Sequence, residues 1–395
     1  MASYSNRGTK RKPNWQYRVI VGKDPLTGKY KRVSKAGFRR KDDAIRAAEI
    51  LERQVYNGEY LAPVKITFQE LAAQWIDHYS VDAKESSVRA RQKAVNVAIN
   101  ELGEYQLYQI TKNVYQTFID NMSKKYSKNY VDSIHSSSDM AFQYAKEMQY
   151  IKEVPSEGVK RPKKRKTVEE LENENISEQF LEKHELMTFL SVAKEHGLDN
   201  DFVLFTLLAY SGCRIGELQA LKWSDIDFEA HTIRITKTYY NPNNNKRSYK
   251  LTPPKTDSSI RTISIDPAVI KLLQDHKNIQ DELKQINHEF YVDNNFVFTG
   301  NEGYPMVYRT IANRMIRLMA MTGIKKHITP HSHRHTHTSL LIEANVHIKE
   351  IQERLGHADI ATTMNIYAAM TKDMKKEAST RFSNIMKDFS INILD

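Results

Sequence analysis

The sequence predicts a multidomain, mainly α-helical protein with two small β elements. Its 395 residues suit two or three domains. Apolar residues recur at helical spacing through most of the chain, whereas the alternation typical of strands is confined to residues 15–34 and 232–265. We therefore expect a small N-terminal β-sheet backed by a helix, then a helical bundle, then a mixed, mainly α unit with a small three-stranded β insertion.

The first unit is expected to span residues 1–60. Residues 15–22 alternate like a strand, a turn follows at 24–28, and residues 29–34 form the hairpin partner within a three-stranded sheet. A helix over residues 41–56 places Ile45, Ala48 and Leu51 on one stripe, which would cover one face of that sheet.

Positive charge is concentrated in this first unit. The net charge of the chain is +11, and residues 1–41 hold thirteen Lys or Arg against a single acid, Asp24. A solvated basic face is the alternative, but so dense a cluster favours a surface for a polyanion. A small basic sheet fits a DNA groove. The candidate DNA-binding residues are Arg18, Lys29, Lys31, Arg32, Arg39 and Arg40.

Residues 64–158 are expected to form the helical bundle. Thr67 caps a helix over residues 68–80, and further helices are predicted near 87–102, 112–122 and 128–148. A linker over residues 159–175 follows, because no periodicity supports a fold there. Its basic run either tracks a phosphate backbone or is a plain solvated tether. The candidate DNA-binding residues in it are Lys163, Lys164 and Arg165.

The third unit is expected to span residues 176–395. Helices are predicted at 201–210 and 214–221, followed by strands at 232–237, 250–252 and 260–265. Asp266 and Pro267 form a cap and first turn for a helix that reaches about residue 285. Later helices are expected near 306–321, 331–344, 348–355 and 361–369, and a C-terminal tail helix over 372–389.

Composition excludes several classes of protein. No run of about eighteen apolar residues occurs, so no membrane span or membrane partner is expected. The first fifteen residues lack the apolar core of a secretory signal. The single cysteine, Cys213, excludes an internal disulfide framework and fits a reducing cytoplasm. No GxxxxGK[ST] phosphate loop occurs, so no ATP-dependent chemistry is indicated.

The residues that suggest chemistry lie in the third unit. Arginine and histidine supply the fixed charge and proton donors that a pentacovalent phosphate needs, and a tyrosine offers an oxygen nucleophile. Taken singly these residues prove little: Arg214 three residues before Glu217 favours a structural ion pair, and His331 after Pro330 favours a cap. Tyr367 is one of 21 tyrosines.

The joint pattern is more informative. The segments SGCRIGELQALKW, PPKTDSSIRTISI, TPHSHRHTH and LGHADIATTMNIY occur in this order. Together they resemble the catalytic domain of the tyrosine recombinases, the phage integrase family. The whole layout is similar to the integrases of phages and integrative conjugative elements of low-GC Gram-positive bacteria. The resemblance implies an arm-type DNA-binding domain at 1–60, a SAM-like core-binding domain at 64–158 and a catalytic domain at 176–395.

The resemblance also implies a function and roles for residues. The protein would be a site-specific recombinase that cuts and rejoins DNA through a 3′-phosphotyrosyl intermediate to integrate or excise a mobile element. Its chemistry would resemble that of type IB topoisomerases and would need no metal, ATP or other cofactor. Arg214 and Arg334 would clamp the scissile phosphate, with Glu217 orienting Arg214. The remaining roles are Lys255 as the acid for the leaving 5′-oxygen, His331 as the acceptor of the nucleophile's proton, His357 as a phosphate hydrogen-bond donor and Tyr367 as the nucleophile.

The histidine series at residues 331–337 raises an alternative, a metal site. Residues two apart on a helix point about 200° apart, so the alternating histidines cannot all converge on one ion. His335 and His337 are instead expected to pack or to support the site. His333 departs from the family, which places an apolar residue before this arginine, so the packing beneath Arg334 is left open.

Two alternative functions are a regulator of the same fold that binds DNA without cleaving it, and a metal-dependent tyrosine relaxase. The full set of six residues argues against the first. The resemblance further implies double-stranded DNA with core-type and arm-type sites as partner and a homo-tetramer in the synaptic complex, formed from a protein that is a monomer when free. An excisionase and a host DNA-bending protein are the expected helpers, in the cytoplasm of a bacterial host at its nucleoid.

Overall fold

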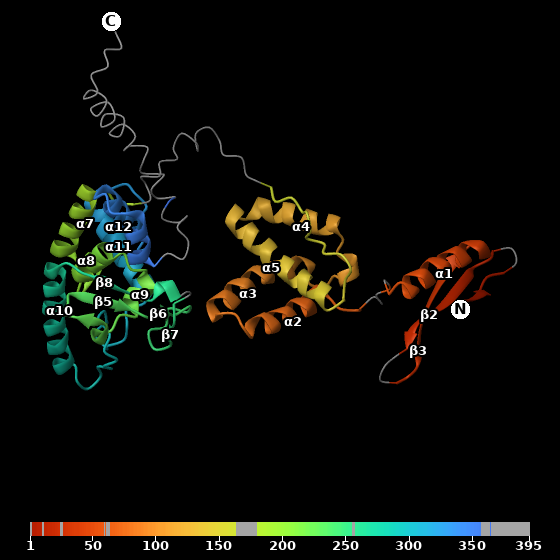
Figure 1. The fold of residues 1–395 in the computed structure, drawn as a ribbon, viewed down its shortest axis with the longest axis horizontal. Coiled ribbons are helices and arrows are strands. Elements are labelled where there is room, and N and C mark those ends of the chain that lie inside the picture. Colours follow the sequence, from red (N-terminus) through yellow and green to blue (C-terminus); the bar gives the residue numbers. More distant parts are fainter. Residues whose placement is uncertain are drawn as a thin grey trace, which may run out of the picture. The chain divides into compact units, whose positions relative to one another are not determined.

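The computed structural model describes residues 2–9, 12–23, 27–58, 60, 64–162, 180–254, 257–356 and 364. The chain divides into two compact units, residues 1–165 and 166–395 (Figure 1). Within the first unit the N-terminal sheet and the helical bundle have separate apolar cores. The predicted fold class, mainly α with a small N-terminal sheet and a small β insertion in the C-terminal unit, is confirmed.

The N-terminal sheet has three antiparallel strands in the order β1-β2-β3, and one helix packs on it. The strands are β1 (Ser3–Asn6), β2 (Trp15–Lys23) and β3 (Tyr30–Phe38), and the helix is α1 (Lys41–Tyr56). Tyr17 and Val19 point from β2 toward Ala48 and Leu51 of α1, and all four are buried. Because side chains alternate along a strand, Arg18 and Ile20 lie on the opposite, exposed face.

The helical bundle comprises α2 (Phe68–Ser80), α3 (Glu85–Leu102), α4 (Lys112–Lys125) and α5 (Lys128–Glu147). Thr67 and Glu70 form a capping box that fixes the start of α2. The core is aromatic, with Phe68, Tyr115 and Phe142 fully buried against one another. The unit extends past residue 158, since the Lys160 amide donates to Gln116 Oε1 at 2.9 Å. The start of the predicted linker therefore packs on the bundle.

The C-terminal unit surrounds a small sheet with helices. The chain enters through α7 (Lys183–His196), α8 (Asp201–Ser211) and the short α9 (Ile215–Gln219). After the β segments come α10 (Pro267–Ile286), α11 (Tyr308–Thr322), α12 (Ser332–Glu343) and α13 (Ile348–Leu355). Helix α8 has apolar residues on all sides and is buried except at Phe202 and Tyr210, which places it at the centre of this core.

The β insertion differs in detail from the prediction. Its three-stranded sheet has the order β4-β5-β8, from β4 (Ile226–Asp227), β5 (Thr232–Ile235) and β8 (Arg261–Ser264). The predicted strand at 250–252 is present as β7 (Lys250–Thr252), but it pairs with β6 (Thr238–Tyr240) in a separate two-stranded ladder. The strand predicted over 232–237 ends at Ile235, and residues 236–237 belong to no strand.

No helix among the described residues is long and apolar enough to cross a membrane.

Candidate active site

Arg214 is positioned by the junction between α8 and α9. Gly212 ends α8 with φ +62°, and a Cβ added there would come within 2.5 Å of His337 Cδ2 and 2.8 Å of Leu355 Cδ2. Only glycine therefore allows α8 to end in close contact with α12 and α13. Arg214 is the N-cap of α9, where Glu217 Oε2 accepts from its amide at 3.0 Å and Glu217 Oε1 from its Nη1 at 2.8 Å.

The start of α12 supplies the other two described site residues. His331 is the N-cap of α12 and is exposed, whereas Arg334, one helical turn on, is only 2% exposed. The ring of His331 meets the ring of His335 edge-on at 5.0 Å between centroids. The sequence places His331 and Arg334 three apart, and the helix puts them on neighbouring positions of one face.

The two arginines converge on the C-terminal end of α13. Arg334 Nη2 donates to the carbonyl of Leu355 at 2.7 Å, and its Nη1 to the carbonyl of Gly212 at 2.8 Å. Arg214 Nη2 donates to the carbonyl of Gly356 at 3.1 Å. The carbonyls of Leu355 and Gly356 belong to consecutive residues at the end of α13, the negative end of its helix dipole, which attracts cations. The structure therefore brings Arg214 and Arg334 together at the residue directly before His357.

The electrostatics of the cluster suit an anion. Burial, followed by the charge of Arg214, lowers the pKa of Arg334 to about 9, so its guanidinium is still charged at neutral pH. Partial burial, and then the charges of His335, Arg334 and Arg214, lower the pKa of His331. Two arginines therefore face one buried carboxylate, Glu217, and the remaining positive charge favours a bound phosphate.

The other histidines of the series have separate surroundings. His333 is fully buried, with its ring 5.3 Å from that of Phe189 and 5.8 Å from that of Phe205. His337 Nδ1 bonds the carbonyl of Ala209 at 2.8 Å, and its Nε2 accepts from Arg354 at 3.1 Å. In the described part of the chain, no three His, Cys, Asp or Glu side chains gather as metal ligands. His333 thus packs as an apolar residue, and His337 supports the junction of α8, α12 and α13.

Sequence reasoning missed two arginines, Arg261 and Arg354. Arg261 Nη2 donates to Glu217 Oε2 at 2.9 Å, and its Nε donates to the carbonyl of Arg354 at 2.7 Å. Arg354 in turn donates from Nη2 to the carbonyls of Tyr210 and Ser264. The signal for Arg261 was available: it occupies the inward position of an alternating strand, in line with Ile263, where a charge needs a buried partner.

Several predicted site residues lie outside the described residues: Lys255, His357, Tyr367, Lys163, Lys164 and Arg165. The C-terminal tail helix predicted at 372–389 lies there too. The described chain ends at Pro254 before Lys255 and at Gly356 before His357.

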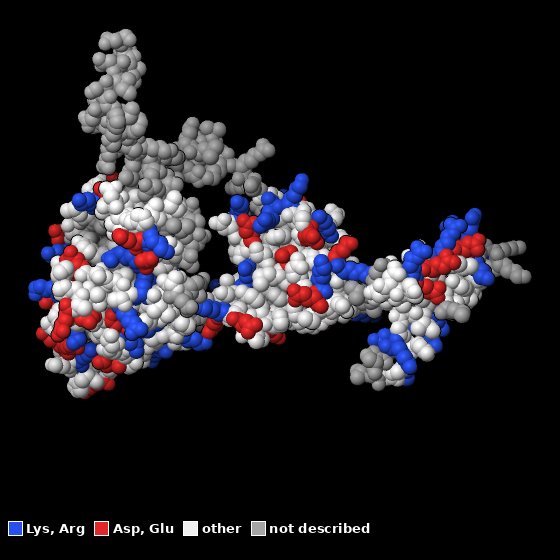
Figure 2. All heavy atoms as spheres, viewed as in Figure 1, with Lys and Arg blue, Asp and Glu red and all other residues white. Residues whose placement is uncertain are grey.

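The six candidate DNA-binding residues of the first unit are all exposed. Lys and Arg are visible over α1 and along the β2–β3 hairpin (Figure 2). Arg18 and Arg32 lie on the face of the sheet opposite α1, where Arg18 opposes Ser34 and Arg32 opposes Ile20. Lys29, Arg39 and Arg40 flank the strand β3 at its two ends.

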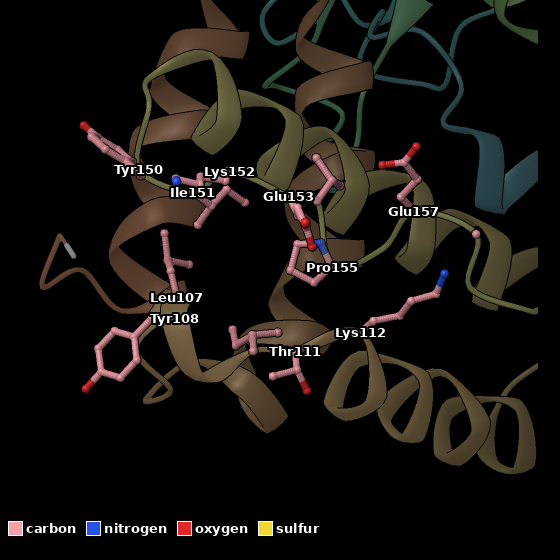
Figure 3. A pocket seen from close by; sticks show the side chains of 13 residues that line it. Leu107, Tyr108, Thr111, Lys112, Tyr150, Ile151, Lys152, Glu153, Pro155 and Glu157 are labelled. Atoms are coloured by element: carbon pink, nitrogen blue, oxygen red, sulfur yellow. The ribbon is translucent and has the colours of Figure 1, made fainter. Parts of the chain in front are cut away.

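A cavity of about 660 Å³ lies in the helical bundle, away from these residues. Its lining includes Leu107, Tyr108, Tyr150 and Pro155, with Lys112 and Glu157 at one side (Figure 3). None of the predicted catalytic residues lines it, so it forms no part of the candidate active site.

Comparison with known proteins identifies the family. The phage integrase family matches residues 179–374, and its N-terminal SAM-like domain matches residues 67–123. The prophage ps2 probable integrase of Lactococcus lactis subsp. lactis is 30% identical over 92% of this chain and 96% of its own. The integrase of Staphylococcus phage L54a is 29% identical over 87% of this chain and 99% of its own.

Solved structures show the same fold. The Tn1549 transposon integrase in complex with circular intermediate DNA matches with a TM-score of 0.61 and 21% identity, over 79% of this chain and 99% of that one. A lambda integrase tetramer bound to a Holliday junction matches with a TM-score of 0.54 and 16% identity, over 89% and 92% of the two chains.

Proposed function

Since this chain belongs to the phage integrase family and is a site-specific recombinase that cleaves and rejoins DNA, we propose that Tyr367 is its nucleophile. Arg214, Arg334, His331, Lys255 and His357 complete the site. The observation that carries this proposal is the convergence of Arg214 and Arg334 on consecutive carbonyls at the end of α13. This convergence gathers fixed positive charge one residue before His357 and eleven before Tyr367.

The arginines form the phosphate clamp. Their N–H donors are directed at backbone carbonyls, and an anionic phosphate oxygen is a stronger acceptor than a carbonyl. Arg214, whose side chain is 37% exposed, is the more accessible of the two. Glu217 holds its Nη1, and its Nη2 donates to the carbonyl of Gly356, an acceptor that a phosphate oxygen would replace. His357 adds a further hydrogen bond to a non-bridging oxygen.

The reaction needs two proton transfers. The hydroxyl of Tyr367 attacks phosphorus and gives its proton to His331, whose lowered pKa leaves the ring neutral and able to accept it. The bond from phosphorus to the 5′-oxygen breaks, and Lys255 donates a proton to that oxygen. The products are a 3′-phosphotyrosine and a 5′-hydroxyl. The number of phosphoester bonds is conserved, so the 5′-hydroxyl of another strand can attack the phosphotyrosine and reverse the step without ATP.

The N-terminal sheet and its helix bind a second class of DNA site, the arm-type site. The exposed face of the sheet carries Arg18, Ile20 and Arg32 side by side, since Ile20 opposes Arg32 across the two strands. Arginine forks bind guanine edges and an apolar side chain contacts the thymine methyl in a major groove. Lys29, Lys31, Arg39 and Arg40, like Lys163, Lys164 and Arg165 in the linker, contact phosphates.

The working assembly is a tetramer on two core-type DNA sites, formed from a free monomer. A solved relative is a lambda integrase tetramer bound to a Holliday junction, which supports this proposal. The integrase activity serves integration and excision of a mobile element in the cytoplasm of a bacterial host, at the nucleoid, with an excisionase and a host DNA-bending protein as helpers. The names of relatives from phages and an integrative element support that biological role.

The test uses a core-type duplex selected from a random pool by binding to the full-length Tyr367→Phe protein. The selected duplex is nicked close to the cleavage position, so that the released 5′-hydroxyl strand diffuses away and the adduct accumulates. We expect a covalent adduct in EDTA that retains the 3′-phosphate and is absent with Tyr367→Phe. An adduct that needs a metal ion or carries a 5′-phosphate would instead indicate relaxase chemistry. DNA binding without any adduct would indicate an inactive regulator.

A further inference from the structure

We infer that Arg261 is a positioning residue that joins the three catalytic segments of this recombinase, an inference that rests on the proposed function. The segments are the loop that carries Lys255, the Arg214–Glu217 pair, and the end of α13 that leads into His357. Arg261 touches all three, although it contacts neither DNA nor the nucleophile in the proposed mechanism.

Each nitrogen of the Arg261 guanidinium bonds a different segment. Its Nη1 donates to the carbonyl of Ser259 at 3.0 Å, four residues beyond Lys255. Its Nη2 donates to Glu217 Oε2 at 2.9 Å, and Glu217 holds Arg214 through its other oxygen. Its Nε donates to the carbonyl of Arg354 at 2.7 Å, three residues before His357. A planar fork with fixed donor directions therefore sets the mutual distances of these segments.

Burial makes the arrangement rigid. The side chain of Arg261 is 6% exposed and that of Glu217 is 1% exposed. Burial by itself raises the pKa of the Glu217 carboxyl, but the hydrogen bond and charge of Arg261, together with Arg214, lower that pKa. Without Arg261 a buried carboxylate would have Arg214 as its main cation, and breaking a buried pair in this way is costly. Glu217 would then compete with the phosphate for Arg214.

Arg261 completes a series of three arginines on the end of α13. The carbonyls of Arg354, Leu355 and Gly356 accept from Arg261, Arg334 and Arg214 in turn. Gly356, with φ +66°, lies so close that an added Cβ would be 3.0 Å from the carbonyl oxygen of Ser258 and 3.2 Å from Arg261 Nη1. Arg261 therefore fills the contact between the Lys255 loop and the His357 segment. Two of the three arginines clamp the phosphate, and the third holds the backbone that all three share.

The competing interpretation is that Arg261 is an ordinary structural ion pair. Arg314 provides a matched control in the same unit. Its Nη1 also donates to a buried carboxylate, Asp201 Oδ1, at 3.0 Å and to a backbone carbonyl, that of Asp199. Asp201 is 1% exposed, like Glu217. Arg314 joins the middle of α11 to the start of α8 and has no hydrogen bond to any of the three catalytic segments.

The experiment compares full-length Arg261→Gln, Arg261→Lys and Arg314→Gln on the selected nicked duplex. It measures thermal stability, binding of the duplex and the rate of adduct formation at saturating DNA. We expect both Arg261 variants to lower the rate about 10- to 100-fold with binding within about twofold of wild type. Lysine keeps the charge, but its donors lie on a single nitrogen and cannot reproduce the planar fork that reaches three separate acceptors. Arg261→Lys keeps the test valid if Arg261→Gln does not fold.

We expect Arg314→Gln to lower stability at a cleavage rate within about twofold of wild type. The inference is overturned if the foldable Arg261 variants cleave within about twofold of Arg314→Gln, or if their loss of rate equals their loss of binding. Absence of the adduct with wild type itself would refute the proposed function, which is a separate result.

Discussion

Replacing His333 with leucine should stabilise the catalytic unit, and more so in acid. His333 is fully buried between the rings of Phe189 and Phe205, and neither ring nitrogen has a hydrogen-bond partner among the described residues. A buried polar group without a partner costs about 1–3 kcal/mol. Leucine has a similar volume and no polar atoms, although its different shape costs up to about 1.5 kcal/mol. We expect a net gain of about 1 kcal/mol at pH 7.

The dependence on pH follows from the pKa of His333. Burial lowers this pKa from 6.5 to about 4 in the folded protein. As the pH falls below 6.5, the unfolded chain binds a proton at this residue and the folded chain does not, so stability is lost until the pH approaches 4. At about 1.4 kcal/mol per pH unit, wild type loses about 2 kcal/mol through His333 between pH 7 and pH 5. The leucine variant avoids this loss, so its advantage grows to about 3 kcal/mol.

Cys213 offers an assay confined to the catalytic unit. It is the single cysteine of the chain and is 5% exposed, and burial raises the pKa of its thiol to about 11. A pulse of dithiodipyridine, which reacts in weak acid, labels Cys213 only where this unit has unfolded. Labelling across a urea series at pH 7 and pH 5 gives the unfolding free energy of each protein by linear extrapolation.

An exposed histidine supplies the control for this measurement. His196→Leu changes the last turn of α7 at a position open to solvent, so it should give neither the gain at pH 7 nor the larger gain at pH 5. An advantage of His333→Leu that stays the same at both pH values would refute the assignment of a depressed pKa. A destabilised variant at pH 7 would show that His333 has a partner that stabilises it.

Three further predictions follow from the site and the N-terminal sheet. His331 must be neutral to accept the proton of Tyr367, and its pKa is lowered, so the cleavage rate should be constant down to about pH 6.5 and fall only below it. His331→Asn should lower the rate about 10²- to 10⁴-fold. If the rate of this variant still falls below pH 6.5, His331 is not the group whose protonation causes the fall. Gly212→Ala should destabilise the catalytic unit by more than about 1 kcal/mol, because φ at Gly212 is +62° and His337 and Leu355 occupy the space that the added Cβ needs. Cys213 labelling that is the same in this variant as in wild type would contradict this close contact. Arg18→Ala and Arg32→Ala should each weaken binding of a selected arm-type duplex by about 1–3 kcal/mol. Arg46→Ala, exposed on α1, should leave that binding unchanged. Equal losses of binding for all three variants would mean that the exposed face of the sheet does not recognise the DNA sequence.

Local signals explain which elements were predicted well. The bounds of α1, α2 and α13 agree with the predicted ranges, because each combines a helical apolar stripe with a clear start or stop. Helix α2 has a capping box at Thr67, and α13 ends at Gly356 in the left-handed conformation. Strands β4 and β6 were missed because strands of two or three residues are too short to show a period.

The same distinction applies to the site. Arg214, His331 and Arg334 were predicted from motif order. In the structure Arg214 and Arg334 meet at the end of α13, and their charges act on His331 at the start of α12. The sequence did not predict a role for Arg261, because its contacts are with residues 44 and 93 positions away. The family prefers an apolar residue at the position of His333. Its sequence neighbours do not show how a histidine fits there, whereas the structure shows its imidazole packed against the rings of Phe189 and Phe205.

The central claim, that Tyr367 forms the covalent link to DNA, is tested most directly by finding the modified residue. The adduct with the selected duplex is digested with nuclease and trypsin, and the peptides are sequenced by mass spectrometry. Cleavage after Arg354 and Lys372 gives the peptide LGHADIATTMNIYAAMTK, in which Tyr367 is the one tyrosine. We predict that the residual nucleotide is attached to Tyr367 through its 3′-phosphate. A nucleotide on any other of the 21 tyrosines, or one attached through a 5′-phosphate, would contradict the account.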